Sequence, residues 1–337
     1  MLHELKSLFQ IAEDASQKGL KSVLASVVAL DGSSYRRPGV RMLILEDDSM
    51  HGAVSGGCVE KDILRQAQEV FAIGTPKMMQ YDGRYRLGCE GLLYILIEPV
   101  QNSKAILEAL IKQDEHRSPF KIVSKFKRDE GLQPTSQSVF HFDSGLSLSV
   151  FHAEPDMEEK ESFTQEVKTS MRLIIIGSEH DAVALTQLAS GIGFQVDLVA
   201  PPDDPKQLAN FPGATNFYHY SPEQLSELAP DSRTAVLLMT HSFAKDLKYL
   251  QQLTFLNTGY IGLLGPKKRR EKLFDALLEY NPDLDPAFID GLYGPAGINI
   301  GAETAYEIGI SIVAEILAVM RGQTPKSLKE KKGGIHD

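Results

Sequence analysis

A chain of 337 residues, 42% of them hydrophobic, is long enough to form two domains with separate cores. Its formal net charge of −10 argues against a general nucleic-acid binder, because phosphate backbones attract basic surfaces. The first residues lack a secretory pattern, no apolar run approaches the roughly 20 residues that span a bilayer, and only two cysteines occur, so we expect a cytoplasmic protein with no membrane span.

The first part of the chain predicts an α+β domain over residues 1–155, which contains an SGGC cysteine motif. Apolar residues recur at helical spacing in some segments, and β-branched residues cluster in others. Helices are predicted at residues 1–19, 59–71 and 103–113, and strands at 21–30, 40–46, 51–57, 91–100, 120–126, 138–142 and 146–152.

The composition changes near residue 155. Residues 156–170 are polar, acidic and without glycine, which predicts a linker, although a surface segment inside one domain would have the same composition. Residues 171–322 then alternate predicted strands with predicted helices, and residues 323–337 form a polar tail. The sequence therefore predicts an α/β protein, with the N-terminal α+β domain followed by a C-terminal Rossmann-like, doubly wound parallel sheet.

The SGGC stretch combines two glycines, a thiol and a predicted helix start. Gly56 and Gly57 would let a ligand approach the backbone closely. Cys58 would face unpaired N–H groups and the positive end of the helix dipole, and both favour the thiolate, which is the nucleophile and the metal ligand. A small buried thiol without a chemical role is the alternative interpretation.

Two arginines precede this motif in the loop before the second strand. The guanidinium groups of Arg36 and Arg37 suit phosphate, so convergence of this loop with the SGGC turn would form an anion pocket that contains a thiolate. A solvated loop is the alternative for the arginines. Cys89 lies in a second glycine-flanked turn, either as a small turn residue or as a partner of Cys58 in a sulfur relay.

A series of motifs runs in order along nearly the whole chain: GSSYRRPGVRMLI, GAVSGGCVE, LGCEG, ILIEPV, YIGLLG, PAGINIGAET and AEILAVMRG. In these motifs the chain resembles the xanthine dehydrogenase accessory family, which also serves carbon monoxide dehydrogenase maturation. The resemblance implies a carrier that protects molybdenum cofactor, supports its sulfuration by a cysteine desulfurase, and inserts it into a molybdenum hydroxylase apoenzyme. It is compatible with a homodimer, but no residue specifies the interface.

The resemblance also assigns roles to individual residues. The family's GGC cysteine falls on Cys58 and its GC turn on Cys89, which makes both thiols the chemically active residues and Cys58 a molybdenum contact. The cofactor is a pterin with a phosphate tail and a dithiolene that holds molybdenum, and a soft thiolate with guanidinium groups suits this cargo. The predicted cofactor contacts that complete the motif are Ser55, Gly56, Gly57 and Glu60.

The start of the second domain departs from a dinucleotide-binding fingerprint. Gly177 is in place, but Glu179 stands where the second glycine belongs, and a carboxylate there would meet pyrophosphate badly. The strand over residues 194–200 ends in Ala200 rather than in an acidic residue for the ribose. These departures argue against NAD(P), while a nicotinamide-dependent oxidoreductase stays as the alternative function.

Other residues of the second domain lie at strand ends, where open α/β sheets bind ligands, or in glycine-rich turns. Each histidine could equally be a surface or capping group, and the basic residues 267–270 could form a solvated face rather than an anion site. A thiol hydrolase with Cys58 as nucleophile and His51 as base is a third function, for which no orienting partner of the base is evident. The further predicted cofactor contacts are His180, Asp181, His241, Gly265, Gly297, Gly301 and Glu303.

Overall fold

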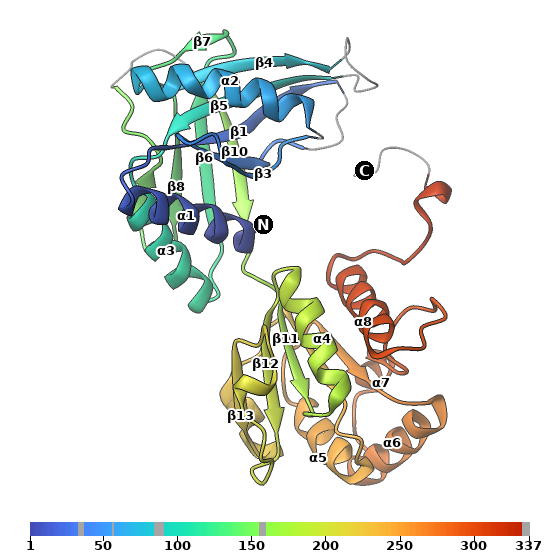
Figure 1. Cartoon of the computed structure of the whole chain (residues 1–337). Coiled ribbons are helices and arrows are strands. Elements are labelled where there is room, and N and C mark those ends of the chain that lie inside the picture. Colours follow the sequence, from blue (N-terminus) through green and yellow to red (C-terminus); the bar gives the residue numbers. More distant parts are fainter. Residues whose placement is uncertain (33–36, 56, 84–90, 155–159, 332–337) are drawn as a thin grey trace. The chain divides into compact units, whose positions relative to one another are not determined.

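The computed structural model of the chain describes residues 1–32, 37–55, 57–83, 91–154 and 160–331. The chain forms two compact units, Met1–Thr169 and Ser170–Asp337 (Figure 1). Across the described residues, no helix is both long and apolar enough to cross a membrane.

Over its described residues, the first unit contains two antiparallel sheets and three α-helices. One sheet has the strand order β3-β2-β1-β5-β4-β7, and the other has the order β10-β6-β8-β9. The strands are β1 (Ser22–Asp31), β2 (Arg41–Leu45), β3 (Met50–Gly52), β4 (Lys77–Asp82), β5 (Leu92–Pro99), β6 (Phe120–Phe126), β7 (Gly131–Leu132), β8 (Gln137–Phe142), β9 (Ser147–Ser149) and β10 (Glu161–Val167). The helices are α1 (Leu2–Gln17), α2 (Cys58–Ile73) and α3 (Ser103–Glu115).

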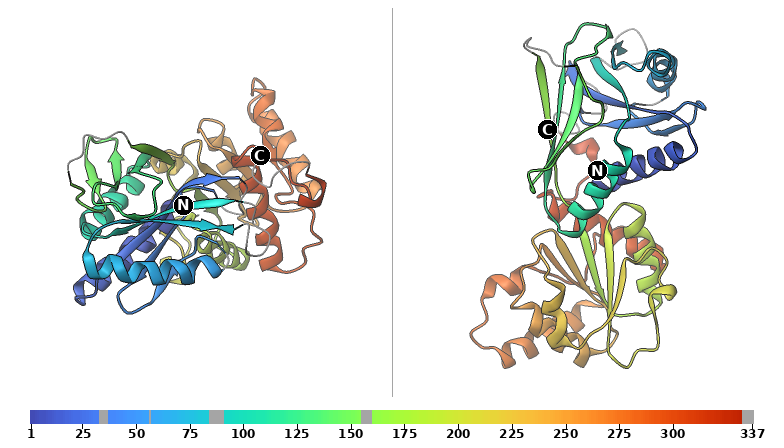
Figure 2. Two further views of the ribbon diagram at one scale, coloured as in Figure 1. Left: turned by 90° about the horizontal axis from the view of Figure 1, so that it is seen from above. Right: turned by 90° about the vertical axis from the view of Figure 1, so that its left-hand side faces the viewer.

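Alternate side chains of β1 pack against different helices on the two faces of the six-stranded sheet. Val23 and Ala25 pack with α2, whereas Leu24 between them packs with α1, α3 and the four-stranded sheet. Successive side chains of a strand point to opposite faces, so β1 is buried on both sides. Figures 1 and 2 show α2 on one face of this sheet and α1 with α3 on the other. Burial on both faces explains why the sequence of β1 is an almost continuous apolar run.

A carboxyl group is buried where the two sheets of the first unit meet. Glu98 of β5 has 0% exposure, and its carboxylate accepts hydrogen bonds from the backbone N–H and the Oγ of Ser138 of β8, each at 2.6 Å. Burial raises the pKa of Glu98 to about 7, although the Ser138 hydrogen bonds and the charge of Arg41 act in the opposite direction. Burial also lowers the pKa of Arg41 to about 10. The Glu98 carboxyl group therefore titrates near neutral pH.

We predict that Glu98 makes the free energy of unfolding depend on pH between 4.5 and about 7, the ordinary and the folded values of its pKa. The folded protein binds this proton more tightly than the unfolded chain does, so the stabilisation is complete below the lower value and is lost as pH rises through the upper one. The loss corresponds to about 3 kcal/mol. Thermal unfolding of wild type and Glu98→Gln, compared at about pH 5 and about pH 8, measures it. The glutamine variant should lack this pH dependence; parallel pH profiles for the two proteins would contradict the assignment.

Part of the predicted linker is a strand, β10. Residues Glu161–Val167 pair antiparallel with β6, from Glu161 opposite Phe126 to Val167 opposite Phe120. Of the side chains in β10 only that of Val167 is buried, because β10 is the edge strand of its sheet. An exposed edge strand has the composition of a linker, so the prediction over residues 156–170 is wrong for these seven residues. Residues 155–159 lie outside the described part of the chain.

The second unit is built on a parallel six-stranded sheet with the order β13-β12-β11-β14-β15-β16. This is the Rossmann order, in which the direction of winding reverses between the first and fourth strands, here β11 and β14. The strands are β11 (Arg172–Ile176), β12 (Gln195–Ala200), β13 (Asn216–His219), β14 (Thr234–Leu238), β15 (Tyr260–Leu263) and β16 (Leu292–Tyr293). The predicted Rossmann-like fold is thereby confirmed.

Helices cover both faces of this sheet (Figure 2). Leu173 and Ile175 of β11 pack in one cluster with α4 and α8, whereas Ile174 and Ile176 pack in another with α5 and α6. The α-helices are α4 (His180–Gly191), α5 (Phe243–Leu253), α6 (Lys267–Tyr280), α7 (Pro286–Asp290) and α8 (Ala305–Met320), and the 3-10 helices are η2 (Leu208–Asn210), η3 (Pro222–Leu228) and η4 (Leu328–Glu330). Because α4, α5 and α6 each follow a parallel strand, their N-termini all lie at the carboxyl edge of the sheet.

Candidate functional site

The SGGC turn of the first unit leads directly into helix α2. The helix begins at Cys58, one residue earlier than predicted, and Gly57 is its N-cap with φ of 111°. That backbone angle lies in the left-handed region, which glycine adopts without the steric cost that a side chain brings. The second glycine of the motif therefore has a conformational reason to be glycine.

The carboxylate of Glu60 holds this turn together. Its Oε1 accepts hydrogen bonds from the backbone N–H groups of Val54 at 3.1 Å and Ser55 at 2.6 Å, and its Oε2 accepts one from Gly57 at 2.6 Å. The Glu60 side chain is only 7% exposed. A carboxylate at the third position of a helix commonly reaches back to the N-cap N–H in this way. The structure thus gives Glu60 a positioning role, and its contact with a cofactor stays a prediction.

Several predicted site residues of the first unit fall outside the described structure. These are Arg36, Gly56 and Cys89, together with the side chain of Cys58. Of the neighbouring residues, Ser55 is half-buried and Arg37 is exposed. Convergence of the arginine loop with the SGGC turn therefore stays a prediction.

We predict that Glu60→Ala lowers the free energy of unfolding by about 3 kcal/mol, because it leaves one buried and two partly buried N–H groups of the turn without their charged acceptor. Glu60→Gln should cost less, since its amide oxygen can still accept hydrogen bonds. Lys61→Ala, on the exposed side of the same helix, is the control and should stay within about 0.5 kcal/mol of wild type. Circular dichroism during urea unfolding measures all three. An alanine variant as stable as the Lys61 control would show that the turn does not depend on Glu60.

In the second unit, Gly177 lies at the switch point between β11 and β14. Its φ is 133°, and a Cβ atom built there would lie 2.5 Å from the backbone oxygen of Met239. The glycine therefore permits close approach of the two strand ends, which is a packing reason that needs no nucleotide.

The turn after Gly177 is occupied by side chains of the chain itself. Ser178 Oγ donates a hydrogen bond to Asp204, and Lys206 Nζ donates one to the backbone oxygen of Ser178. Lys206 Nζ also lies 3.5 Å from the carboxylate of Glu179, which is the N-cap of α4. Asp204 follows β12, where a ribose-binding carboxylate would be sought, but it is already bonded to this turn.

An acid and a histidine meet beside this turn. Asp181, in the first turn of α4, lies 3.9 Å from His241 Nε2, and His241 follows β14 with φ of 57°. The sequence predicted both residues as site residues, and the structure brings them together at the switch point, where doubly wound sheets bind ligands. Both side chains are accessible, and His180 beside them is exposed.

The three predicted glycines that come after β15 all have positive φ, a conformation that glycine adopts without steric cost. Gly265 has φ of 119°, and an added Cβ atom would lie 2.9 Å from Arg269 Cδ. Gly297 has φ of 114°, and its N–H donates to Glu315 Oε2 at 2.8 Å. Gly301 has φ of 71° and open space around it. Glu303 is exposed, and its N–H donates to the capping carboxylate of α8.

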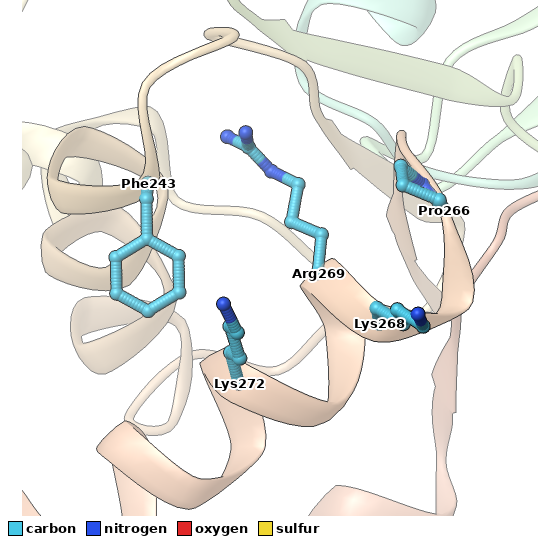
Figure 3. Close-up of a pocket in the computed structure, with 5 residues that line it drawn as sticks. All are labelled: Phe243, Pro266, Lys268, Arg269 and Lys272. Carbon is cyan, nitrogen blue, oxygen red and sulfur yellow. The ribbon is translucent and has the colours of Figure 1, made fainter.

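A cavity of about 590 Å³ lies at the starts of α5 and α6 (Figure 3). It is lined by Phe243, Pro266, Lys268, Arg269 and Lys272. The sequence predicted positive charge near Gly265 but missed Phe243 and Lys272. The four-residue spacing from Lys268 to Lys272 was the available signal, because residues four apart share one helix face.

Within the described residues, no group of three or more His, Cys, Asp or Glu side chains is arranged to hold a metal ion. The side chain of Cys58 and the whole of Cys89 are not among these residues.

Comparison with known proteins covers both halves of the chain. Residues 173–316 match the XdhC Rossmann domain, and residues 15–82 match the XdhC and CoxI family. A protein of Bacillus subtilis described as a probable xanthine dehydrogenase subunit is 29% identical over 317 residues, 88% of this chain and 92% of that protein. The molybdenum cofactor insertion chaperone PaoD of Escherichia coli is 23% identical over 333 residues, 96% of this chain and 91% of that protein. A crystal structure described as a xanthine dehydrogenase from Bacillus halodurans superposes with a TM-score of 0.77 at 28% identity, covering 94% of this chain and 96% of that one.

Proposed function

This chain belongs to the XdhC and CoxI family, and from that premise we propose that it binds molybdenum cofactor and inserts it into a xanthine-dehydrogenase-type molybdenum hydroxylase apoenzyme. The observation that carries the proposal is the similarity to a molybdenum cofactor insertion chaperone, which extends over 96% of this chain and 91% of that protein. The similarity extends over both units of this chain, so we propose a function for the whole chain rather than for one domain.

The SGGC turn is the part of the chain that we propose to meet the molybdenum centre. Cys58 begins α2, whose dipole favours the thiolate, but the Glu60 carboxylate lies at the same helix end and offsets part of that effect. The helix dipole and the Glu60 carboxylate together therefore favour the thiolate less than the dipole alone would. Coordination to a metal deprotonates a thiol outright, so Cys58 is better suited to binding molybdenum than to acting as a free nucleophile.

We propose that Cys58 and Cys89 support sulfuration of the bound cofactor with a cysteine desulfurase as partner, in the cytoplasm. Arg36 and Arg37 would bind the phosphate tail, because guanidinium groups match its oxygens. A homodimer is compatible with this role.

The alternative, a nicotinamide-dependent oxidoreductase, has little support from the second unit. The Gly177 turn is tied to Asp204 and Lys206, and Glu179 places a carboxylate where pyrophosphate would pass. We therefore propose that this Rossmann-like unit does not use NAD(P) for hydride transfer.

We predict that wild-type protein retains a near-equimolar amount of molybdenum cofactor after anaerobic loading and desalting, and that Cys58→Ala retains much less. The reason is the loss of the soft ligand for the metal. Arg37→Ala should show an intermediate loss, since one phosphate contact is removed while the thiolate stays. Metal analysis and pterin fluorescence of the same samples measure retention, and Lys61→Ala is the surface control.

Two outcomes would contradict this prediction at different points. No retention by wild type would overturn the carrier function. Equal retention by wild type and Cys58→Ala would keep the carrier function but remove Cys58 from the binding site.

A further inference from the structure

The cavity at the starts of α5 and α6 has the chemistry of an anion site. Its lining combines three cations, Lys268, Arg269 and Lys272, with the apolar side chains of Phe243 and Pro266. The lining helices follow β14 and β15, so the cavity opens at the carboxyl edge of the parallel sheet, where α/β proteins bind ligands. This place is distinct from the Gly177 turn, which follows β11.

The cations of the cavity are only partly neutralised by the chain. Arg269 is bonded to the buried carboxylate of Asp246 at 2.6 Å, and Thr240 Oγ1 donates to the same carboxylate at 2.6 Å. Within the described residues, neither Lys268 nor Lys272 forms an ion pair. Two unpaired lysines one helical turn apart repel each other, and a bound anion would remove that repulsion.

Asp246 fixes the position of Arg269 in the wall of the cavity. Asp246 is 2% exposed and fixes one side of the guanidinium group, which restricts its orientation before any ligand arrives. The Arg269 Nε atom is buried and has no hydrogen-bond partner among the described residues. Figure 3 shows the Arg269 side chain extending between Phe243 and Pro266.

The start of α6 adds donors to the same cavity. Its N-cap is Pro266, which offers no side-chain acceptor, and its first turn contains no acidic residue. The N–H groups of Arg269 and Arg270 donate to the backbone oxygen of Pro266, so the donors of this turn without a capping side chain are those of Lys267 and Lys268. Opposite them, the ring of Phe243 is 38% exposed, which gives the cavity a flat apolar wall.

We propose that this cavity binds a phosphate ester that carries a ring. Lys268, Lys272 and the start of α6 contact the phosphate oxygens, and the attached ring lies against Phe243. A free nucleotide has this chemistry, and we assign the cavity to it, because the proposed function places the phosphate tail of the pterin cargo at Arg36 and Arg37. The site itself does not depend on the proposed function, and its occupation by the cargo is the alternative outcome of the test.

The test is equilibrium binding of ADP and of pyrophosphate to the full chain at low ionic strength, by isothermal titration calorimetry. Wild type should bind both probes, and the double variant Lys268→Gln/Lys272→Gln should bind each at least about tenfold more weakly. The control, Lys248→Gln/Lys329→Gln, changes net charge equally at exposed positions outside the cavity lining and should bind like wild type. Phe243→Ala should weaken binding of ADP but not of pyrophosphate, because only ADP carries a ring.

Repeating the ADP titration on cofactor-loaded protein distinguishes a free nucleotide from the cargo phosphate. Loss of ADP binding, together with reduced cofactor retention by the lysine double variant, assigns the cavity to the cargo phosphate. Unchanged ADP binding assigns it to a separate nucleotide. The inference is overturned if wild type binds neither probe, or if the double variant and its charge-matched control bind equally. Binding of ADP by a chain that retains no molybdenum cofactor would overturn the proposed function alone.

Discussion

The turn that presents Cys58 depends on one buried carboxylate. Glu60 accepts hydrogen bonds from the N–H groups of Val54, Ser55 and Gly57, so a single side chain satisfies backbone on both sides of residue 56. Without it, the buried N–H of Val54 and the partly buried N–H groups of Ser55 and Gly57 would lose their acceptor. The same carboxylate offsets the helix dipole beside the thiol. The geometry of the turn and the chemistry expected of Cys58 therefore have a common origin.

The second unit shows how a Rossmann order can be kept while its usual ligand turn is closed. At the start of α4, Ser178, Asp204 and Lys206 are bonded to one another. At the start of α6, by contrast, a cavity with three lining cations stays open. Both places lie at the carboxyl edge of the same sheet, so the fold supplies several ligand positions and local side chains decide which of them is usable.

Much of the fold was predictable because both units have strong periodic patterns. The alternating strands and helices after residue 171 predicted the parallel sheet, and the family resemblance based on the motifs is confirmed by the comparisons. Strand β10 was missed because an edge strand with one buried side chain has no apolar period. The capping role of Glu60 could have been predicted, since its spacing from Gly57 is that of a capping box. The cavity could not have been predicted, because Phe243 and Lys272 meet only when α5 and α6 lie side by side.

Delivery of molybdenum cofactor can be measured directly as transfer from one protein to another. Protein loaded anaerobically with the cofactor would be mixed with a molybdenum hydroxylase apoenzyme, the two proteins separated, and molybdenum and pterin measured in each. We expect both to move together to the apoenzyme, and faster than from the same amount of free cofactor. Cofactor that stays with the carrier, or reaches the apoenzyme no faster than free cofactor does, would contradict delivery.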